Sequence, residues 1–149
     1  MTNYEHLELC KALPKHSADC AKIYERAWNT ALPDYRRTIS EEEFLAETGG
    51  ETTIVALQDA EVMGYISIWE PDCFIHHIYV DPNHQGVGIG TVLLNEAIML
   101  AIARPLSLKC QRANTKAMEF YQHARFQETE EFGVDSYGPW VKLMRSATK

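Results

Sequence analysis

Apolar residues recur with helical spacing in the first part of the chain. Ala21, Tyr24, Trp28 and Ala31 are separated by three or four positions, and the charged residues around them fall on the opposite side. This period predicts an amphipathic helix from about residue 17. Pro33 should end the helix, because proline cannot continue one.

Capping residues and short apolar runs predict the other elements. Ser40 with Glu43 three positions later is typical of a capping box, so a short helix should begin there and continue through Leu45. Asn114 is a good N-cap for a helix through His123. Runs bounded by proline, glycine or polar turns predict a long helix at residues 91–103 and strands around residues 7–9, 52–57, 62–69, 73–80, 106–110, 126–132 and 140–144.

These elements follow one another without a linker, a repeat or a low-complexity segment. The 149 residues fit one domain and are enough to bury a substantial core. Hydrophobic residues make up 46% of the chain and charged residues 23%, which is typical of a globular protein. The sequence therefore predicts a single domain, residues 1–149, of the α/β (α+β) class.

The charge pattern narrows the range of partners. The formal net charge is −7 and no run of Lys or Arg occurs, so we expect no nucleic-acid partner. A negative surface attracts cationic partners such as amines, although it serves solubility equally well. No stretch reaches the roughly 18 apolar residues of a membrane helix, and the N-terminus lacks a signal-peptide pattern. We expect a cytoplasmic protein without a membrane contact.

The four cysteines, Cys10, Cys20, Cys73 and Cys110, are far apart and form no CxxC pair. In a chain without a secretion signal they are most simply free thiols in the core. We therefore expect no metal site built on cysteine.

The segment at residues 78–94 carries the chemistry. A β-branched strand ends at Val80, Pro82 blocks its extension, and Gly86, Gly88 and Gly90 alternate just before the apolar helix. Glycines let the backbone turn sharply and approach a ligand without a Cβ in the way. The first turn of a helix offers unpaired N–H groups and the positive end of the helix dipole. The pattern predicts a site for phosphate oxygens.

Two common phosphate-binding motifs do not fit this loop. The P-loop requires Gly-Lys-Ser/Thr at the helix start, but Gly90 is followed by Thr91. The dinucleotide fingerprint requires GxGxxG directly after the strand and an acidic residue about 20 positions on. The next strand ends instead in Lys109-Cys110-Gln111.

A third motif does fit the loop. Gln85-Gly-Val-Gly88-Ile-Gly90 resembles the Q/R-x-x-G-x-G/A motif of the GNAT N-acetyltransferase superfamily. The preceding run from Ile78 through Val80 to Pro82 resembles the strand that leads into that motif.

A second resemblance lies downstream. The segment Asn114-Thr-Lys-Ala117-Met-Glu-Phe120-Tyr121, with Phe126 after it, resembles the N-x-x-A-x-x-F-Y-x-x-x-G-F segment of the same family. Arg125 replaces the family glycine, a departure at the local turn that touches no expected catalytic atom. The resemblance covers about residues 53–126 and is weak over the first fifty residues.

The resemblance implies a mixed, mostly antiparallel central sheet flanked by helices, with a V-shaped splay at the coenzyme A site. It implies an acyltransferase that moves an acetyl group from acetyl-CoA, its co-substrate, directly to a primary amine, without a metal. The residues that it assigns to acetyl-CoA binding are Ile78, Tyr79, Val80, Gln85, Gly86, Val87, Gly88, Ile89, Gly90, Thr91, Asn114, Ala117 and Phe120.

The resemblance also implies roles for these residues. Backbone amides of residues 85–90 would hold the pyrophosphate, and the edge of residues 78–80 would pair with the pantetheine arm as an added strand does. The Val80 amide would polarise the thioester carbonyl. Asn114 would contact the pantetheine. Tyr121, with an ordinary pKa near 10, would donate a proton to the departing sulfur.

A histidine of His76-His77 is expected to help deprotonate the acceptor amine. Neighbouring strand residues face opposite sides, so only one of the two can point into the cleft unless the strand has a bulge. His76 is the first choice because many family members carry an acid near its position, and Glu70 is the reserve. Each histidine could instead be a buried, hydrogen-bonded structural residue.

The acceptor is left open between a small-molecule amine and a protein amino group, and a homodimer is compatible with the sequence. Trp28, Tyr35, Arg36 and Arg37 lie in the region that shapes the acceptor pocket in this family. The two arginines could equally be a solvated charge cluster.

Two other functions stay open. A catalytically silent protein that binds or senses acyl-CoA would keep the glycine loop and dispense with Tyr121. A thiol enzyme would form an acetyl-cysteine at Cys73 or Cys110, although neither lies in a recognisable activating motif.

Overall fold

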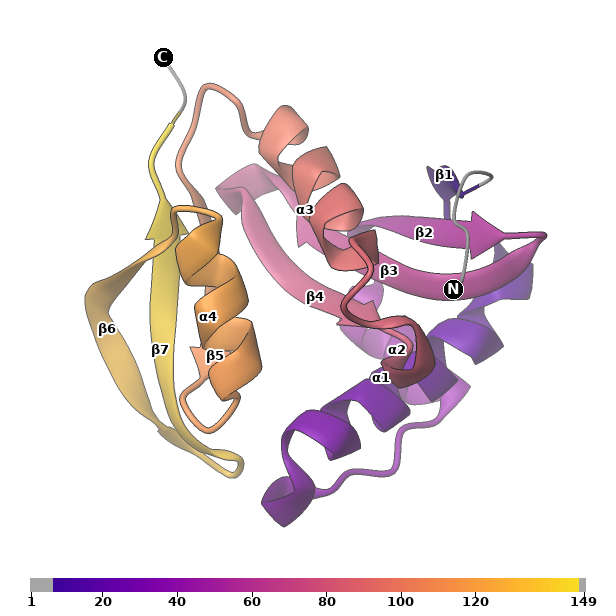
Figure 1. Ribbon diagram of the computed structural model, residues 1–149, viewed down its shortest axis with the longest axis horizontal. Coiled ribbons are helices and arrows are strands. Elements are labelled where there is room, and N and C mark those ends of the chain that lie inside the picture. Colours follow the sequence, from indigo (N-terminus) through magenta and orange to yellow (C-terminus); the bar gives the residue numbers. More distant parts are fainter. Residues whose placement is uncertain (1–6, 148–149) are drawn as a thin grey trace.

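The computed structural model describes residues 7–147, which form a mixed sheet with helices against both faces (Figure 1). The strands are β1 (Glu8–Lys11), β2 (Thr52–Gln58), β3 (Glu61–Trp69), β4 (Phe74–Val80), β5 (Leu106–Gln111), β6 (Gln127–Asp135) and β7 (Gly138–Arg145). The α-helices are α1 (Ser17–Ala31), α2 (Glu41–Thr48), α3 (Ile89–Leu100) and α4 (Thr115–His123). The 3-10 helices are η1 (Pro14–His16), η2 (Pro33–Tyr35), η3 (Glu70–Asp72) and η4 (Pro82–His84). Among these helices none is long and apolar enough to cross a membrane.

The strand order is β1-β2-β3-β4-β5-β7-β6, and every neighbouring pair is antiparallel except β4 and β5. Those two strands are parallel and pair at only two positions, Phe74 with Ser107 and Ile75 with Leu108. Beyond these positions they separate, with β5, β6, β7 and α4 on one side and β1 to β4 on the other (Figure 1). The predicted mostly antiparallel sheet with a V-shaped splay is confirmed.

The sheet divides two hydrophobic cores. One face packs against α3 and α4, with Leu93 and Tyr121 among its buried side chains. The other face packs against α1 and α2, where Tyr24 and Phe44 meet Tyr65 of β3. Each fully buried side chain of this size contributes about 1.5–3 kcal/mol to folding, so the two cores hold the helices to their faces.

The predicted N-caps form, but the reciprocal half of the capping box at Ser40 does not, and the Glu43 carboxylate pairs with Arg37 instead. The Ser40 hydroxyl accepts a hydrogen bond from Glu43 N at 3.0 Å at the start of α2. The Asn114 side chain accepts one from Ala117 N at 3.2 Å at the start of α4. Each cap satisfies a backbone N–H that the helix itself leaves unpaired.

At the end of α4, Arg125 adopts the backbone conformation expected of the glycine that it replaces. Arg125 has a φ of 72°, in the left-handed region. The Arg125 N–H donates to the Gln122 carbonyl, and the Phe126 N–H donates to the Tyr121 carbonyl, each at 3.0 Å. This pair of hydrogen bonds is the Schellman motif. The motif brings the rings of Phe126 and Tyr121 to 5.6 Å between centroids.

Three predicted boundaries were wrong. Helix α3 begins at Ile89 instead of residue 91, because Gly88 forms its N-cap with a φ of 97° and Gly90 already lies in the first turn. The helix ends at Leu100 instead of residue 103, because Ala101 leaves helical geometry. Strand β4 excludes Cys73, which adopts a φ of 47°.

Candidate active site

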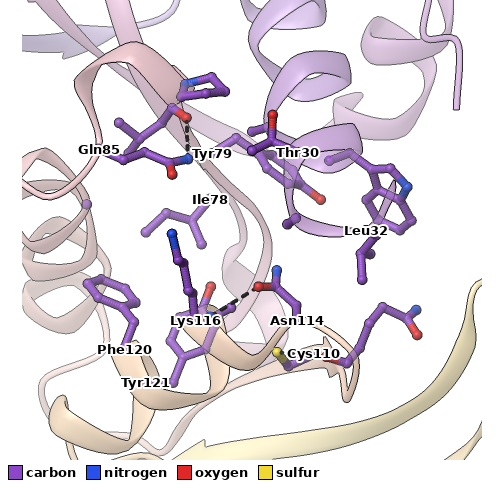
Figure 2. A pocket seen from close by; sticks show the side chains of 18 of the residues that line it. Thr30, Leu32, Ile78, Tyr79, Gln85, Cys110, Asn114, Lys116, Phe120 and Tyr121 are labelled. Carbon is purple, nitrogen blue, oxygen red and sulfur yellow. Dashed lines mark hydrogen bonds between the residues drawn. The ribbon is translucent and has the colours of Figure 1, made fainter. Parts of the chain in front are cut away.

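A cleft of about 1000 Å³ opens where β4 and β5 diverge (Figure 2). Its walls come from β4, the loop after it, the start of α3, the end of β5, the start of α4 and the second half of α1. Among the sequence-predicted site residues, those that line the cleft are His76, Ile78, Tyr79, Val80, Gln85, Gly86, Gly88, Ile89, Gly90, Thr91, Asn114, Ala117, Phe120 and Tyr121. Val87, His77 and Glu70 are outside this lining.

The edge of β4 that faces the cleft has backbone groups without a strand partner. Asp81 N donates to Met63 O on β3 at 2.8 Å, and alternate residues of an antiparallel strand face opposite edges. Ile78 and Val80 therefore present their backbone groups away from β3, toward β5. Since β5 pairs with β4 only around Ile75, this edge is free to accept an extended ligand.

The glycines of the loop are not equivalent. Gly86 and Gly88 have φ values of 82° and 97°, and a Cβ at either position would meet no atom within 4 Å. These two positions need glycine for their backbone conformation, and they face open space. A Cβ at Gly90 would lie 3.4 Å from the Phe120 ring, so this glycine serves the close approach of α3 to α4.

Gln85 ties the loop to the end of β4. Its side-chain Nε2 donates to Val80 O at 3.0 Å (Figure 2). Val87, which was expected to bind the cofactor, lies in this loop but is 49% exposed and outside the cleft lining. The loop therefore combines a side-chain anchor with the unpaired backbone N–H groups of the first turn of α3.

Tyr121 and Cys110 lie on the side of the cleft formed by α4 and β5 (Figure 2). The Tyr121 ring packs between Phe120 and Phe126, and burial raises the pKa of its hydroxyl above the ordinary value. Burial also raises the pKa of the Cys110 thiol to about 12. Both groups are therefore protonated at neutral pH, which disfavours Cys110 as a nucleophile because only the thiolate attacks.

Lys116 lines the cleft and was not singled out by the sequence. Figure 2 shows its side chain reaching from α4 toward Ile78. An exposed lysine in the first turn of a helix has no distinguishing pattern of its own, so only its place opposite β4 reveals it.

Strand β4 bulges at His76. Ser67 pairs with His77 and the next residue of β3, Ile68, pairs with Ile75, so His76 has no partner on β3. This extra residue breaks the alternation of sides. The rings of His76 and His77 consequently lie 4.4 Å apart between centroids, instead of on opposite faces of the sheet.

His77 is a buried residue with both ring nitrogens engaged. Its Nδ1 is 2.9 Å from the Tyr65 hydroxyl and its Nε2 is 3.2 Å from Glu47. Burial lowers the pKa of His77 and raises that of Tyr65, so both are neutral at pH 7. The Tyr65 hydroxyl then donates to Nδ1, and the Nε2 proton is donated to Glu47. This arrangement fits the structural role for His77 and leaves no lone pair for a substrate.

Glu47 is the centre of a network that the sequence did not predict. Its carboxylate accepts from the Tyr24 hydroxyl at 2.9 Å and from Arg37 at 3.3 Å, in addition to His77. Burial opposes ionisation of Glu47, but the hydrogen bonds from His77 and Tyr24 outweigh it and lower the pKa to about 2. The network joins α1, the segment before α2, α2 and β4.

Arg37 is enclosed by other side chains, so the interpretation of Arg37 as part of a solvated charge cluster is wrong. Its guanidinium carbon lies 4.8 Å from the ring centroid of Trp28, 4.9 Å from that of Tyr137 and 5.1 Å from that of Tyr24. Only 15% of the Arg37 side chain is exposed. Arg36, by contrast, is exposed as that interpretation expects.

One group of side chains has donor atoms suited to a transition metal. Glu47, His76 and His77 each place one such atom within 4.8 Å of the others. The Arg37 guanidinium already bonds to the same carboxylate, and its charge opposes a second cation. The group is better explained by the hydrogen bonds that it makes.

His76 and Glu70 differ in their access to the cleft. The His76 side chain is 37% exposed and lines the cleft, and its Nδ1 lies 2.8 Å from the Glu51 carboxylate. Glu70, the reserve base, lies in η3 outside the lining, and its carboxylate accepts a hydrogen bond from the Thr52 hydroxyl. Of the three residues considered for a base, the structure brings only His76 to the cleft.

Solved structures with the same fold come from several organisms. A GCN5-related N-acetyltransferase from Rhodopseudomonas palustris superposes with a TM-score of 0.79 at 22% identity, over 93% of this chain and 94% of that one. An N-acetyltransferase from Thermoplasma acidophilum, solved with coenzyme A, gives 0.76 at 16% identity over 94% and 98%. A phosphinothricin acetyltransferase from Sinorhizobium meliloti, solved with acetyl-CoA, gives 0.72 at 21% identity over 95% and 89%.

One curated relative is similar over a shorter segment. It is an uncharacterized N-acetyltransferase from Methanocaldococcus jannaschii, 44% identical over 59 residues. The match covers 38% of this chain and about a quarter, 26%, of that protein.

The family comparison covers most of the chain. The model described as the acetyltransferase (GNAT) family matches residues 17–126, from the start of α1 to the residue that closes the Schellman motif. The matched segment contains the whole of β4, the glycine loop and α4. The chain therefore belongs to the acetyltransferase (GNAT) family, a family of acyltransferase enzymes.

Proposed function

We propose that this protein transfers the acetyl group of acetyl-CoA directly to a primary amine held in the same cleft. The observation that carries the proposal is one cleft lined by a free strand edge, a glycine loop at a helix start and a protonated tyrosine. The two fold neighbours solved with coenzyme A or acetyl-CoA support the choice of donor.

The residues of the cleft fit the donor. Acetyl-CoA supplies an activated thioester together with a long arm and a pyrophosphate. The backbone N–H groups of residues 85–90 would hold the pyrophosphate at the N-terminus of α3, where Gly86 and Gly88 face open space. Ile78 would pair with the arm through its backbone groups. The Val80 carbonyl is bound to Gln85 Nε2, but the Val80 N–H would polarise the thioester carbonyl. Asn114 would contact the arm from the start of α4.

Two side chains would handle the protons. The acceptor reaches the cleft as an ammonium ion and must lose one proton before its nitrogen can attack. His76 Nε2 would accept that proton. Tyr121 would donate its hydroxyl proton to the sulfur as the carbon–sulfur bond breaks, and its raised pKa keeps that proton in place until then. The acceptor nitrogen, which then carries the acetyl group, would lose its second proton to the Tyr121 phenolate. The products are a neutral amide and a neutral thiol, Tyr121 regains its hydroxyl, and the proton on His76 passes to solvent.

The proposal is tested with purified protein, acetyl-CoA and a panel of amines. The panel contains amino acids, aminoglycosides and a peptide with a free N-terminus, and turnover is measured as release of the coenzyme A thiol. We expect release with at least one amine. Tight acetyl-CoA binding by calorimetry without release in any reaction would indicate a silent acyl-CoA-binding protein.

A separate measurement addresses a covalent intermediate. Direct transfer predicts no change in protein mass after incubation with acetyl-CoA alone. A gain of one acetyl group that alkylation of Cys73 or Cys110 prevents would replace direct transfer by a thiol mechanism.

A further inference from the structure

His76 is held by a carboxylate that lies outside the cleft. We infer that Glu51 is a positioning residue, which fixes the ring nitrogen that His76 presents to the cleft. This inference rests on the proposed transfer function, because it concerns the group that would deprotonate the acceptor. Glu51 is not among the cleft-lining residues, so any effect on the reaction passes through His76.

The Glu51 carboxylate is fixed before it meets His76. Its side chain is only 8% exposed, and its Oε1 accepts a hydrogen bond from the Ser67 hydroxyl at 2.6 Å. Ser67 is fully buried on β3, and its Oγ lies 2.9 Å from the Thr53 hydroxyl. The Glu51 backbone N–H is bound to Thr48 O at 3.0 Å. Because Glu51 is restrained at its backbone and at one carboxylate oxygen, the other oxygen can hold the His76 ring in one orientation.

The hydrogen bond from His76 determines the tautomer of its imidazole. An ionised carboxylate only accepts, so the proton in the 2.8 Å contact between His76 Nδ1 and Glu51 Oε2 belongs to the histidine. In a neutral ring the lone pair is then on Nε2. Nε2 of His76 forms no hydrogen bond with any residue in the described part of the chain, so that lone pair is available at the cleft.

The adjacent pair shows the opposite arrangement. His77 donates its Nε2 proton to Glu47, and its Nδ1 accepts a hydrogen bond from the Tyr65 hydroxyl. His77 therefore carries its proton on Nε2 and has no free ring nitrogen. Two neighbouring histidines, each bound to one glutamate, therefore hold opposite tautomers. The bulge at His76 makes this difference, because it moves His76 toward Glu51 and keeps His77 in the buried core.

The wild-type protein tests the tautomer directly. Side-chain ¹⁵N NMR of histidine-labelled protein is recorded at mildly alkaline pH, where an ordinary imidazole with a pKa of about 6.5 is neutral. We expect the proton of His76 on Nδ1 and that of His77 on Nε2, with the resonances assigned by comparison with His76→Gln. A His76 proton found on Nε2 would overturn the inference without any mutation at Glu51.

The variant Glu51→Ala tests the consequence. Without the carboxylate the His76 proton should redistribute between the two nitrogens, and kcat should fall about 10-fold to 100-fold while the Kd for acetyl-CoA is unchanged. Glu42→Ala is the matched control, because Glu42 is an exposed glutamate on α2. Ser67→Ala, which removes the hydroxyl that restrains Glu51, should shift the tautomer in the same direction by a smaller amount.

The outcomes separate this inference from the proposed function. A lower kcat with an unchanged His76 tautomer would mean that Glu51 only supports the fold, and the inference would be rejected. A changed tautomer with full turnover would support Glu51 as the positioning residue and remove His76 from the proposed chemistry. If Glu51→Ala does not fold, the wild-type spectrum and Ser67→Ala still decide the question.

Discussion

The two ends of the cleft are built from different parts of the chain. Toward α3, the groups available to a ligand are backbone groups: the N–H groups of residues 85–90 and the free edge of residues 78–80. Behind the other end, toward α1 and α2, lies a network of side chains that do not themselves line the cleft, in which Arg37, Glu47 and His77 are joined.

The difference determines how each end responds to substitution. A site of backbone groups changes only when a substitution alters the backbone or fills the space in front of it. A side-chain network changes when any one member is lost, because the remaining members keep buried donors and acceptors without partners. The first end should therefore fail in binding or chemistry while the fold survives, and the second should fail in stability.

The largest effect is expected for Tyr121→Phe, on the side of the cleft formed by α4 and β5. Loss of the hydroxyl proton should lower kcat by about 10²–10⁴-fold, with little change in the Kd for acetyl-CoA. Steady-state kinetics and calorimetry measure the two quantities. An equal loss of affinity and rate would mean that Tyr121 binds the donor, and unchanged turnover would make it only a core residue.

Gly88→Val should break the backbone end. The φ of 97° at this position is an outlier for a β-branched residue, and a valine side chain would project into the space in front of the loop. We expect the affinity for acetyl-CoA to fall at least about 100-fold, equivalent to about 2.7 kcal/mol, in a folded protein. Calorimetry that shows wild-type affinity, with an unchanged circular dichroism spectrum, would contradict the pyrophosphate assignment.

Arg37→Ala should break the side-chain end. It removes a guanidinium enclosed by three aromatic rings, and with it the positive charge that pairs with the Glu43 and Glu47 carboxylates. We expect the free energy of unfolding to fall by about 2 kcal/mol, measured by urea denaturation. Arg36→Ala, at the neighbouring exposed arginine, is the control and should have no measurable effect. Equal effects of the two variants would refute the network.

The pH dependence of stability sharpens the comparison at His77. Burial lowers the pKa of His77 below the ordinary 6.5, so the unfolded chain takes up a proton more readily than the folded one. The stability from His77 is therefore complete above pH 6.5 and is lost as the pH falls below it. His77→Gln, which can replace both hydrogen bonds, should flatten the fall in unfolding free energy between about pH 7 and 5. His123→Gln, at an exposed histidine, should retain it.

The smallest effect is expected for Arg125→Gly. Glycine removes the strain of an arginine with a φ of 72°, but it also adds conformational entropy to the unfolded chain. We expect a gain in unfolding free energy of at most about 1 kcal/mol, measured by thermal denaturation, with kcat unchanged. A loss of stability would show that the added entropy of the unfolded chain, together with any contact of the arginine side chain, outweighs the backbone strain.

Features with a local physical cause were predictable from the sequence. The cap residues Ser40 and Asn114 accept hydrogen bonds from N–H groups only three positions away, so a short stretch of sequence is enough to predict them. The glycine loop and Tyr121 were found because a short motif specifies them, and all but Val87 of the residues assigned to acetyl-CoA line one cleft. The start of α3 was misplaced because Gly90 tolerates a helical conformation as easily as a loop.

The tertiary structure decided the relations between side chains that are distant in the sequence. Glu47 and Glu51 reach His77 and His76 across 30 and 25 positions, and no period or motif marks either glutamate. The sequence offered both histidines as candidates, and only the bulge in β4 decides which of them lies at the cleft, since strand pairing with β3 determines which residue is left unpaired. Local backbone preferences thus determined the loop, the caps and α4. The surroundings of each histidine were determined by the packing of β4 against α2, which carries Glu47, and against the segment after α2, which carries Glu51.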